Sequence, residues 1–248
     1  MGNPLHQLRV AVGFLTRIPM GDVTRGGRIE VDMAKAVPWF PLVGAVIGAA
    51  IGGVYVFSDE LLNVRVASVL AVAAGLLITG AFHHDGLADI ADAFGGGTTV
   101  ERRMEILKDS RLGTYGTAAL CVAIVGEILA ISELKGAEAF AAIVVAHSLG
   151  RSMALGATIL APPAGGGLGA DYMERLSPIG VLAGMLVGVA AAVILSPVFP
   201  LITIGVATVS AVVVVALSIR KIGGINGDVL GAIVVVSGLA TLIIAGAT

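Results

Sequence analysis

The chain has 248 residues, of which 57% are hydrophobic and 13% charged, with a formal net charge of −2 and a mean hydropathy of +1.00. A soluble domain is about 25% charged, so this composition excludes an ordinary soluble protein, and the lack of a basic tract argues against nucleic acid as a partner. Abundant Gly, Ala and Val are typical of a polytopic membrane protein whose small residues let helix backbones approach closely.

The first 18 residues predict a helix that lies along the membrane surface rather than across it. Arg9 and Arg17 interrupt its apolar positions, and both side chains are long enough to reach the headgroups while their stems stay in the apolar layer. No small-residue cleavage site follows. We therefore expect no cleaved signal peptide here.

Apolar stretches long enough to cross a bilayer follow one another along the rest of the chain. A transmembrane helix needs about 20 mainly apolar residues, and seven stretches meet this requirement. The predicted fold is therefore all-α, a polytopic helical bundle that forms a single transmembrane domain over residues 1–248. The predicted spans are 37–57, 65–83, 115–132, 138–160, 178–196, 198–219 and 229–247.

Lys and Arg are distributed unevenly between the two sides that these spans define. If the N-terminus and every second loop share one side, that side holds twelve basic residues, and the other holds only Arg65 and Lys135. Basic residues concentrate in cytoplasmic loops, so we predict a cytoplasmic N-terminus in the cell (inner) membrane. The twelve are Arg9, Arg17, Arg25, Arg28, Lys35, Arg102, Arg103, Lys108, Arg111, Arg175, Arg220 and Lys221.

The segment 83–114 follows the second span and is predicted to lie on the cytoplasmic side. If the helix of that span continues into it, Asp85, Asp89 and Asp92 share one face at successive turns. Stacked carboxylates repel unless a cation lies among them, and Mg²⁺ favours carboxylate, water and phosphate oxygens. We therefore predict a Mg²⁺ site on these three aspartates, the alternative being that they simply face water. Gly86 is expected to leave room beside them for a close approach.

Further basic residues surround Asp109 in "ERRMEILKDSRLGTYGT", residues 101–117. This mixture suits a phosphate site, since cations bind the oxyanions while carboxylates hold the metal that bridges them. Gly113 and Gly116 are expected to leave backbone N–H groups open at the start of the third span, where an anion is favoured. A solvated linker with ordinary ion pairs is the alternative. The basic residues concerned are Arg102, Arg103, Lys108 and Arg111.

Three ionisable residues lie well inside predicted spans, away from their ends, where charge is expensive and tends to line a cavity or to pair. His147 and Arg151 are four apart and share a face of the fourth span. Arg151 is expected near its cytoplasmic end, within reach of the acidic site or of a substrate phosphate, unless its role is structural pairing. Glu127 in the third span could face a pocket, pair with His147 or be protonated, and we assign it no catalytic role.

The glycine-rich "GGINGD", residues 223–228, predicts a tight loop at the cytoplasmic end of the sixth span. Its Asn226 and Asp228 could add a contact to a metal or a nucleotide. A turn with an aspartate that caps the next helix is an equally good interpretation.

Several motifs, taken in order, resemble the cobalamin synthase family of adenosylcobinamide-GDP ribazoletransferases. They are "GFLTRIP", "WFPLVGAVIG", "HHDGLADIADAFGGG", "RRMEILKDSRLGTYG", "SLGRS" and "GGINGD", and together they run from about residue 8 to 232. The combination of HxDGxxDxxD with a downstream KDSRxGTYG is specific. One departure is Asn226, where the family commonly has Thr.

The resemblance implies a Mg²⁺-dependent integral membrane transferase. Its activated substrate is adenosylcobinamide-GDP, and its acceptor is α-ribazole or α-ribazole 5′-phosphate. A ribose hydroxyl attacks the phosphorus attached to the cobinamide aminopropanol arm, GMP leaves, and adenosylcobalamin or its 5′-phosphate is formed. Because the corrin is too large to enter a bundle of this size, an open cytoplasmic groove is expected.

On this resemblance, the three aspartates hold Mg²⁺ against the substrate diphosphate. Asp109 completes the metal site or accepts the proton of the ribose hydroxyl, for which His84 is a second candidate, and Lys108 is a third candidate catalytic residue. The candidates for phosphate binding are Arg102, Arg103, Lys108, Arg111 and Arg151. Further candidates are Asn226, Asp228, His147 and Arg17.

Two other functions remain as alternatives at this stage. A CDP-alcohol phosphotransferase also uses an Asp-rich helix, but "DGLADIAD" lacks the Arg of its DGxxAR pattern, and release of CMP rather than GMP would identify it. A secondary transporter would use Glu127, His147 and Arg151 as a coupling site, but we find no inverted repeat. The small-residue faces could serve a homodimer or only the internal bundle.

Overall fold

The computed structural model describes residues 3–21, 29–166 and 168–247, and the regular elements of this part of the chain are helices joined by loops, with one isolated β-bridge. A 3₁₀ turn, η1 (Val37–Trp39), leads into the first long helix. The helices are α1 (Pro4–Leu15), α2 (Ile29–Ala36), α3 (Phe40–Leu61), α4 (Val64–Thr79), α5 (Phe82–Gly96), α6 (Val100–Ile106), α7 (Thr114–Ser132), α8 (Gly136–Leu160), α9 (Leu168–Met173), α10 (Pro178–Leu195), α11 (Pro200–Ile222) and α12 (Gly227–Gly246).

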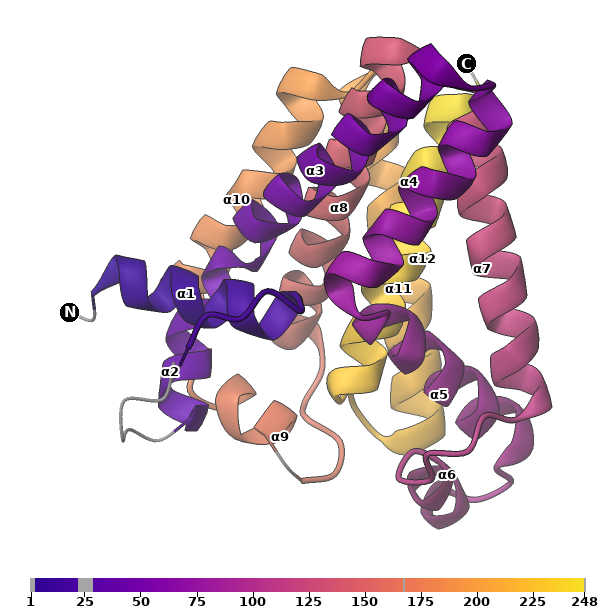
Figure 1. Ribbon diagram of the computed structural model, residues 1–248. Helices are drawn as coiled ribbons and strands as arrows, with labels where there is room; N and C mark the ends of the chain where they lie inside the picture. The colour runs from indigo at the N-terminus through magenta and orange to yellow at the C-terminus, as the bar shows by residue number, and fades with distance from the viewer. Residues whose placement is uncertain (1–2, 22–28, 167, 248) are drawn as a thin grey trace.

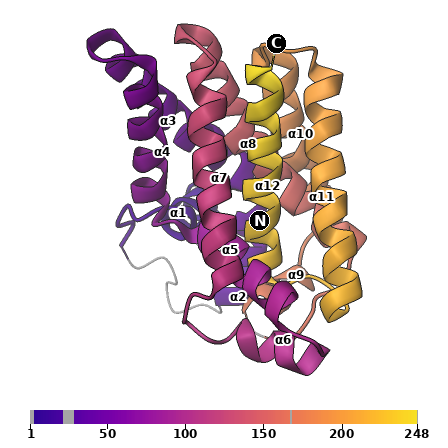
Figure 2. The same cartoon turned by 90° about the vertical axis from the view of Figure 1, so that its right-hand side faces the viewer.

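The seven predicted spans correspond to α3, α4, α7, α8, α10, α11 and α12, which confirms the all-α polytopic bundle. Six helices of the described chain are long and apolar enough to cross a membrane, and the bent pair of α4 and α5 makes up to seven. Successive connections alternate between the two ends of the bundle, with α1, α2, α6 and α9 at one end and the C-terminus at the other (Figures 1 and 2). Arg25 and Arg28, which we counted for the topology, lie outside the described residues.

Close helix packing depends on glycines at the contacts that a central helix, α8, makes with its neighbours. A Cβ on Gly48 of α3 would stand 2.8 Å from the Cα of Val144, and one on Gly150 of α8 would stand 2.7 Å from the Val234 carbonyl oxygen of α12. Neither position can therefore accept even Ala without a shift of backbone, as expected for small-residue helix contacts. These glycines serve the internal bundle.

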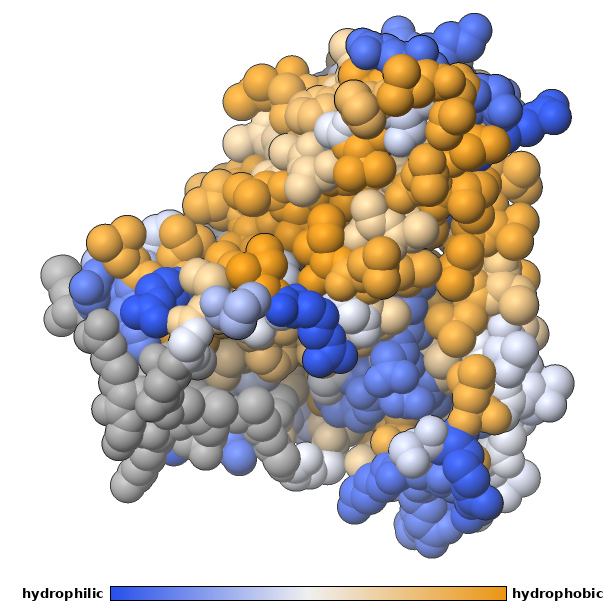
Figure 3. All heavy atoms as spheres, viewed as in Figure 1, coloured by the Kyte–Doolittle hydropathy of each residue, from blue (hydrophilic) through white to orange (hydrophobic). Residues whose placement is uncertain are grey.

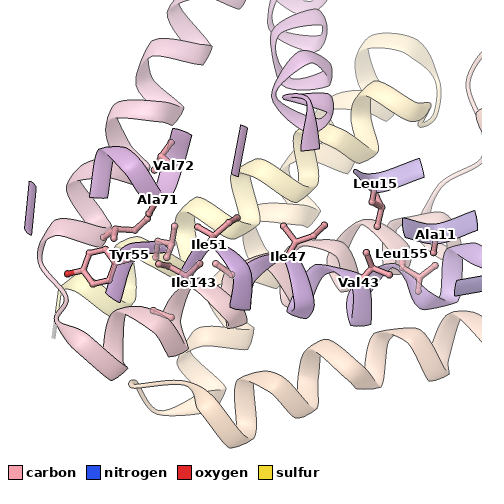
Figure 4. Packing of buried hydrophobic residues seen from close by; sticks show 14 of the residues in the cluster. Ala11, Leu15, Val43, Ile47, Ile51, Tyr55, Ala71, Val72, Ile143 and Leu155 are labelled. Carbon is pink, nitrogen blue, oxygen red and sulfur yellow. The ribbon is translucent and has the colours of Figure 1, made fainter. Parts of the chain in front are cut away.

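Apolar side chains fill the space between α3, α4 and α8 (Figure 4). Ile51 and Tyr55 of α3 are buried, as is Ile143 of α8. The Tyr55 hydroxyl donates a hydrogen bond to the Leu134 carbonyl oxygen at 2.6 Å, so the one polar atom of this ring is satisfied inside the core.

The helix of the second span does not continue into the acidic segment. We had placed the three aspartates on one face on the condition that it did. Gly80 and Ala81 both adopt a left-handed backbone, with φ of 63° and 56°, and α5 turns from α4 by 89°. The backbone N–H of Arg17 donates to the Ile78 carbonyl oxygen at 2.8 Å, and the Arg17 guanidinium occupies the place that a Cβ on Gly80 would take. Arg17 therefore packs at the corner between α4 and α5.

The corner lies at the level of α1, which runs across the bundle rather than along it (Figure 1). On the face that Figure 3 shows, hydrophobic residues cover the bundle above that level, while hydrophilic ones gather below it, around α6, and at the opposite end. Beyond the corner, α5 runs toward the polar end of the bundle that carries α6 (Figure 1).

Candidate active site

The acidic face of α5 passes from solvent to interior along its length. Asp85 is exposed, Asp89 is half-buried and Asp92 is buried. The three carboxylates thus share one helix, as expected, but they do not share one environment.

A fourth carboxylate, that of Asp228, joins this face because α12 begins directly beside α5. A Cβ on Gly86 would stand 2.9 Å from the Asp228 carbonyl oxygen and 3.0 Å from its Cα. We expected Gly86 to leave room for a close approach, and the structure shows that the backbone of α12 makes it. The close approach brings Asp228 into the electrostatic field of Asp85 and Asp89.

Asp89 is the member of the cluster whose ionisation is most affected by the others. Partial burial, and then the negative charges of Asp85, Asp228 and Asp92, raise the pKa of Asp89 to about 6. Burial is the larger cause of this shift, and the like charges that add to it show that negative potential gathers around Asp89. Such a site attracts a cation.

The donors of this cluster fit Mg²⁺ better than a structural metal. Within the described ranges, no three His, Cys, Asp or Glu side chains converge closely enough to hold a metal ion by themselves. Mg²⁺ is usually held by one or two carboxylates and completed by water and substrate phosphates. Asp85 and Asp89, with Asp228 nearby, could supply that partial set.

Asp92 is engaged in a structural contact with the start of α7. Its carboxylate accepts hydrogen bonds from the backbone N–H of Gly113 at 2.7 Å and of Gly116 at 2.8 Å. We expected these N–H groups to be open to a phosphate, and that expectation is wrong, because Asp92 is the anion that occupies them. The contact fixes α7 against α5, and it leaves fewer lone pairs of Asp92 for a metal.

The segment between α6 and α7 holds a tight pair of opposite charges. The Arg111 guanidinium donates to both carboxylate oxygens of Asp109, at 2.9 Å from Nε to Oδ1 and 2.5 Å from Nη2 to Oδ2. Hydrogen bonds from the side chain and backbone of Arg111 lower the pKa of Asp109 to about 2. While Arg111 is in place, Asp109 is therefore a weak proton acceptor at neutral pH.

The other basic residues of this segment differ in how free they are. Arg102 pairs with Glu105 at 2.8 Å on an exposed face, and Lys108 is exposed. Arg103 instead donates to the carbonyl oxygens of Lys221 at 3.0 Å and Thr98 at 3.2 Å. Arg103 thus ties α6 to the end of α11, while Arg102 and Lys108 can turn toward a ligand.

Asn226 caps the helix that carries Asp228. Its side-chain oxygen accepts a hydrogen bond from the Val229 N–H at 3.0 Å, and its Nδ2 donates to the Asp228 carboxylate at 3.1 Å. The adjoining loop is held by backbone hydrogen bonds between Ile225 and the segment 162–164. Asn226 therefore orients Asp228 rather than reaching out of the site.

A second group of polar side chains lies deeper, where α5, α7 and α8 meet. His84 Nε2 lies 3.3 Å from the Glu127 carboxylate. The partner of Glu127 is therefore His84, whereas one of our alternatives paired Glu127 with His147. Arg151 is 2% exposed, and its Nη1 donates to the His147 carbonyl oxygen at 2.7 Å. The Nε of Arg151 has no hydrogen-bond partner, and no ion pair joins the Arg151 guanidinium to a carboxylate of the described chain.

His83, which we did not name as a candidate, lies beside Arg151. Both residues line two cavities, one inside the bundle and one that opens toward α1 and α12. The sequence held a signal for it, since His83 is the first residue of the HxDGxxDxxD pattern. His83 therefore belongs with Arg151 on the wall of these cavities, while the aspartates of α5 lie elsewhere on the same helix.

Comparison with known proteins gives a single result. The chain matches the model of a family described as cobalamin-5-phosphate synthase over residues 7–246. A protein of Shewanella pealeana named adenosylcobinamide-GDP ribazoletransferase is 37% identical, over 92% of this chain and 90% of that protein. Proteins of the same name from Vibrio cholerae and Bradyrhizobium diazoefficiens are each 35% identical, over 92% and 99% of this chain and 88% and 95% of their own lengths. No solved structure matches.

Proposed function

The chain belongs to the cobalamin-5-phosphate synthase family, and from that premise we propose that the acidic face of α5 is where it transfers ribazole. It is an adenosylcobinamide-GDP ribazoletransferase of cobalamin nucleotide-loop assembly and a multi-pass membrane protein. This membership replaces the phosphotransferase and transporter alternatives. The basic residues at the α5 end support a cytoplasmic orientation for this face.

The reaction joins adenosylcobinamide-GDP to α-ribazole or its 5′-phosphate. An O–P bond forms between a ribose hydroxyl and the phosphorus on the cobinamide arm, the diphosphate O–P bond breaks, GMP leaves with the bonding electrons, and the hydroxyl proton passes to a base. Negative charge grows on the transferring and leaving groups, so the site must neutralise it.

The observation that carries this placement is the contact of Gly86 with Asp228, because it gathers acids from two distant parts of the chain. Asp85 and Asp89, with Asp228 beside them, would hold Mg²⁺. When bound there, Mg²⁺ would supply positive charge to the diphosphate. Asp92 would act on the same site mainly by holding α7 against α5.

Phosphate binding falls to the basic residues that can turn toward the acidic face. Arg102 and Lys108 are exposed, and Arg111 is exposed on its pair with Asp109. If a substrate phosphate draws Arg111 away, Asp109 loses the hydrogen bonds that lower its pKa and becomes a stronger base. Binding of the phosphate would thus prepare the acceptor of the ribose proton.

His84 is the other candidate for that acceptor. Its Nε2 is held by Glu127, and it directly precedes Asp85 in the chain. A histidine oriented by a carboxylate is a common arrangement for proton transfer. The pH profile of an Arg111→Ala variant distinguishes Asp109 from His84 as the proton acceptor.

Release of GMP by the purified protein in lipid nanodiscs tests the activity. We expect GMP from adenosylcobinamide-GDP only when both Mg²⁺ and α-ribazole or α-ribazole 5′-phosphate are present, and none after chelation of the metal. GMP release that is unaffected by chelation would remove the metal from the proposal. No release with either acceptor would contradict the activity itself.

A further inference from the structure

A cavity of about 190 Å³ lies between α1, α3, α5, α8, α9 and α12. Both helices that carry the acidic cluster contribute to its wall, α5 through Phe82 and His83 and α12 through Gly227 and Leu230. The cavity and the acidic cluster therefore share these two helices.

The cavity has a preformed aromatic wall. The rings of Phe14 and Phe40 stack at 5.5 Å between centroids, and Phe82 meets Phe14 edge-on at 5.1 Å. Leu155 and Leu230 add aliphatic surface. A flat apolar ring would gain both hydrophobic burial and aromatic contact here.

The inner end of the cavity carries a small polar patch. His83 and Arg151 line it, and both are buried. The unpartnered Nε of Arg151 and the lack of a carboxylate partner in the described chain leave an unmet demand for a hydrogen-bond acceptor. A ligand with one acceptor atom at the edge of an apolar ring would satisfy it.

The volume of the cavity limits which part of the two substrates it can hold. Pockets that enclose a drug-sized ligand usually measure about 300–1,000 Å³, so 190 Å³ suits a single bicyclic ring and neither a corrin nor a guanosine diphosphate. Guanine has several polar atoms at its edge, which this apolar wall would leave without partners. The base of ribazole, a methylated benzimidazole, is apolar and has one free ring nitrogen that accepts a hydrogen bond.

We infer that this cavity binds the base of the acceptor nucleoside, with the ring against the phenylalanine wall and its free nitrogen toward Arg151 and His83. The inference rests on the proposed function and adds to it the place of the acceptor. The ribose is then held at the start of α12, beside the acidic cluster.

Direct binding tests the inference without turnover. We would titrate α-ribazole, and separately adenosylcobinamide-GDP, into the metal-free protein in phosphatidylethanolamine–phosphatidylglycerol nanodiscs by calorimetry. Thr158→Phe adds bulk to the cavity wall. Ile159→Phe places the same side chain at the next residue, which is 57% exposed on the outer surface. GMP release by the unaltered protein is recorded in parallel, so that a failure of the activity is seen separately.

In Thr158→Phe we expect the Kd for α-ribazole to rise at least tenfold and the Kd for adenosylcobinamide-GDP to change less than twofold. In Ile159→Phe we expect both Kd values to be unchanged. If Thr158→Phe is not recovered folded, Ala154→Val, on the same wall, should give a smaller change of the same kind. An unchanged Kd for α-ribazole, or equal losses for both substrates, would overturn the inference. The inference would also be overturned if the cavity held a lipid instead. In that case a phospholipid would co-purify with the unaltered protein, be absent from Thr158→Phe and not be displaced by α-ribazole.

Discussion

Gly86 of α5 and Asp228 of α12 are in backbone contact, since a Cβ on Gly86 would lie 2.9 Å from the Asp228 carbonyl oxygen. The two residues are far apart in the chain, and they bring the start of the last span against the acidic helix. The proposed metal site therefore depends on a helix–helix contact as well as on its carboxylates.

Gly86→Ala is expected to separate these two helices and to displace Asp228 from Asp85 and Asp89. Because misplacement of reacting groups by about 1 Å can cost on the order of 100-fold in rate, we expect a loss of that order in kcat for GMP release. Gly53→Ala is the matched control, since nothing lies within 4 Å of a Cβ at that helical position. Equal activity of the two variants would show that the contact does not organise the site.

Asp92→Asn is expected to damage stability more than a substitution of its exposed neighbour. The Asp92 carboxylate accepts two backbone N–H groups at the start of α7, and an amide can replace only one of these acceptors. Hydrogen bonds to charged groups contribute about 1.5–3 kcal/mol each, so we expect a loss of about 2 kcal/mol. Thermal unfolding in detergent measures it as a lower Tm.

Asp85→Asn provides the comparison, because Asp85 is exposed and no hydrogen bond of its carboxylate is needed to hold α7. It should lower GMP release while leaving the Tm unchanged. A Tm that falls equally in both variants would mean that Asp92 has no special structural role.

Arg111→Ala distinguishes Asp109 from His84 as the proton acceptor. Arg111 lowers the pKa of Asp109 to about 2, so Asp109 stays ionised as the pH falls, and loss of Arg111 lets its pKa rise toward about 3.9. If Asp109 is the base, Arg111→Ala should lose roughly half of its kcat/KM near pH 4, relative to its own plateau. Measured at saturating Mg²⁺, which keeps the metal-binding carboxylates ionised, the acidic limb of the unaltered protein should lie at lower pH.

Arg65→Ala, at the opposite end of the bundle, is the control for this pH profile. Its acidic limb should coincide with that of the unaltered protein. A limb that does not move in Arg111→Ala either would exclude Asp109 and leave His84, which Glu127 holds at 3.3 Å.

Much of the fold could be predicted from the sequence, because a span is a local property of about 20 consecutive residues. The apolar runs therefore gave all seven spans to within a few residues. The break at Gly80 and Ala81 could not be predicted in this way, since a glycine inside an apolar run is common in membrane helices. At this break the Arg17 side chain, from more than 60 positions earlier in the chain, packs over Gly80.

The candidate site was harder to predict, because its contacts join residues that are distant in sequence. The spacing of Asp85, Asp89 and Asp92 indicated a shared helix, which the structure has. It could not reveal that Asp92 turns to the N–H groups of Gly113 and Gly116, since that contact requires α5 to pack on α7. The roles of these residues in binding and catalysis remain predictions.

The central claim is that carboxylates of α5 hold the Mg²⁺ on which transfer depends, and GMP release by Asp89→Asn as a function of Mg²⁺ concentration tests it most directly. Asn keeps the size of the side chain but removes the charge that would bind the ion. We predict turnover reduced by at least about 100-fold at ordinary Mg²⁺ concentration, in a protein that unfolds at the normal temperature. Near-normal turnover, with the same half-saturating Mg²⁺ concentration as the unaltered protein, would contradict the claim.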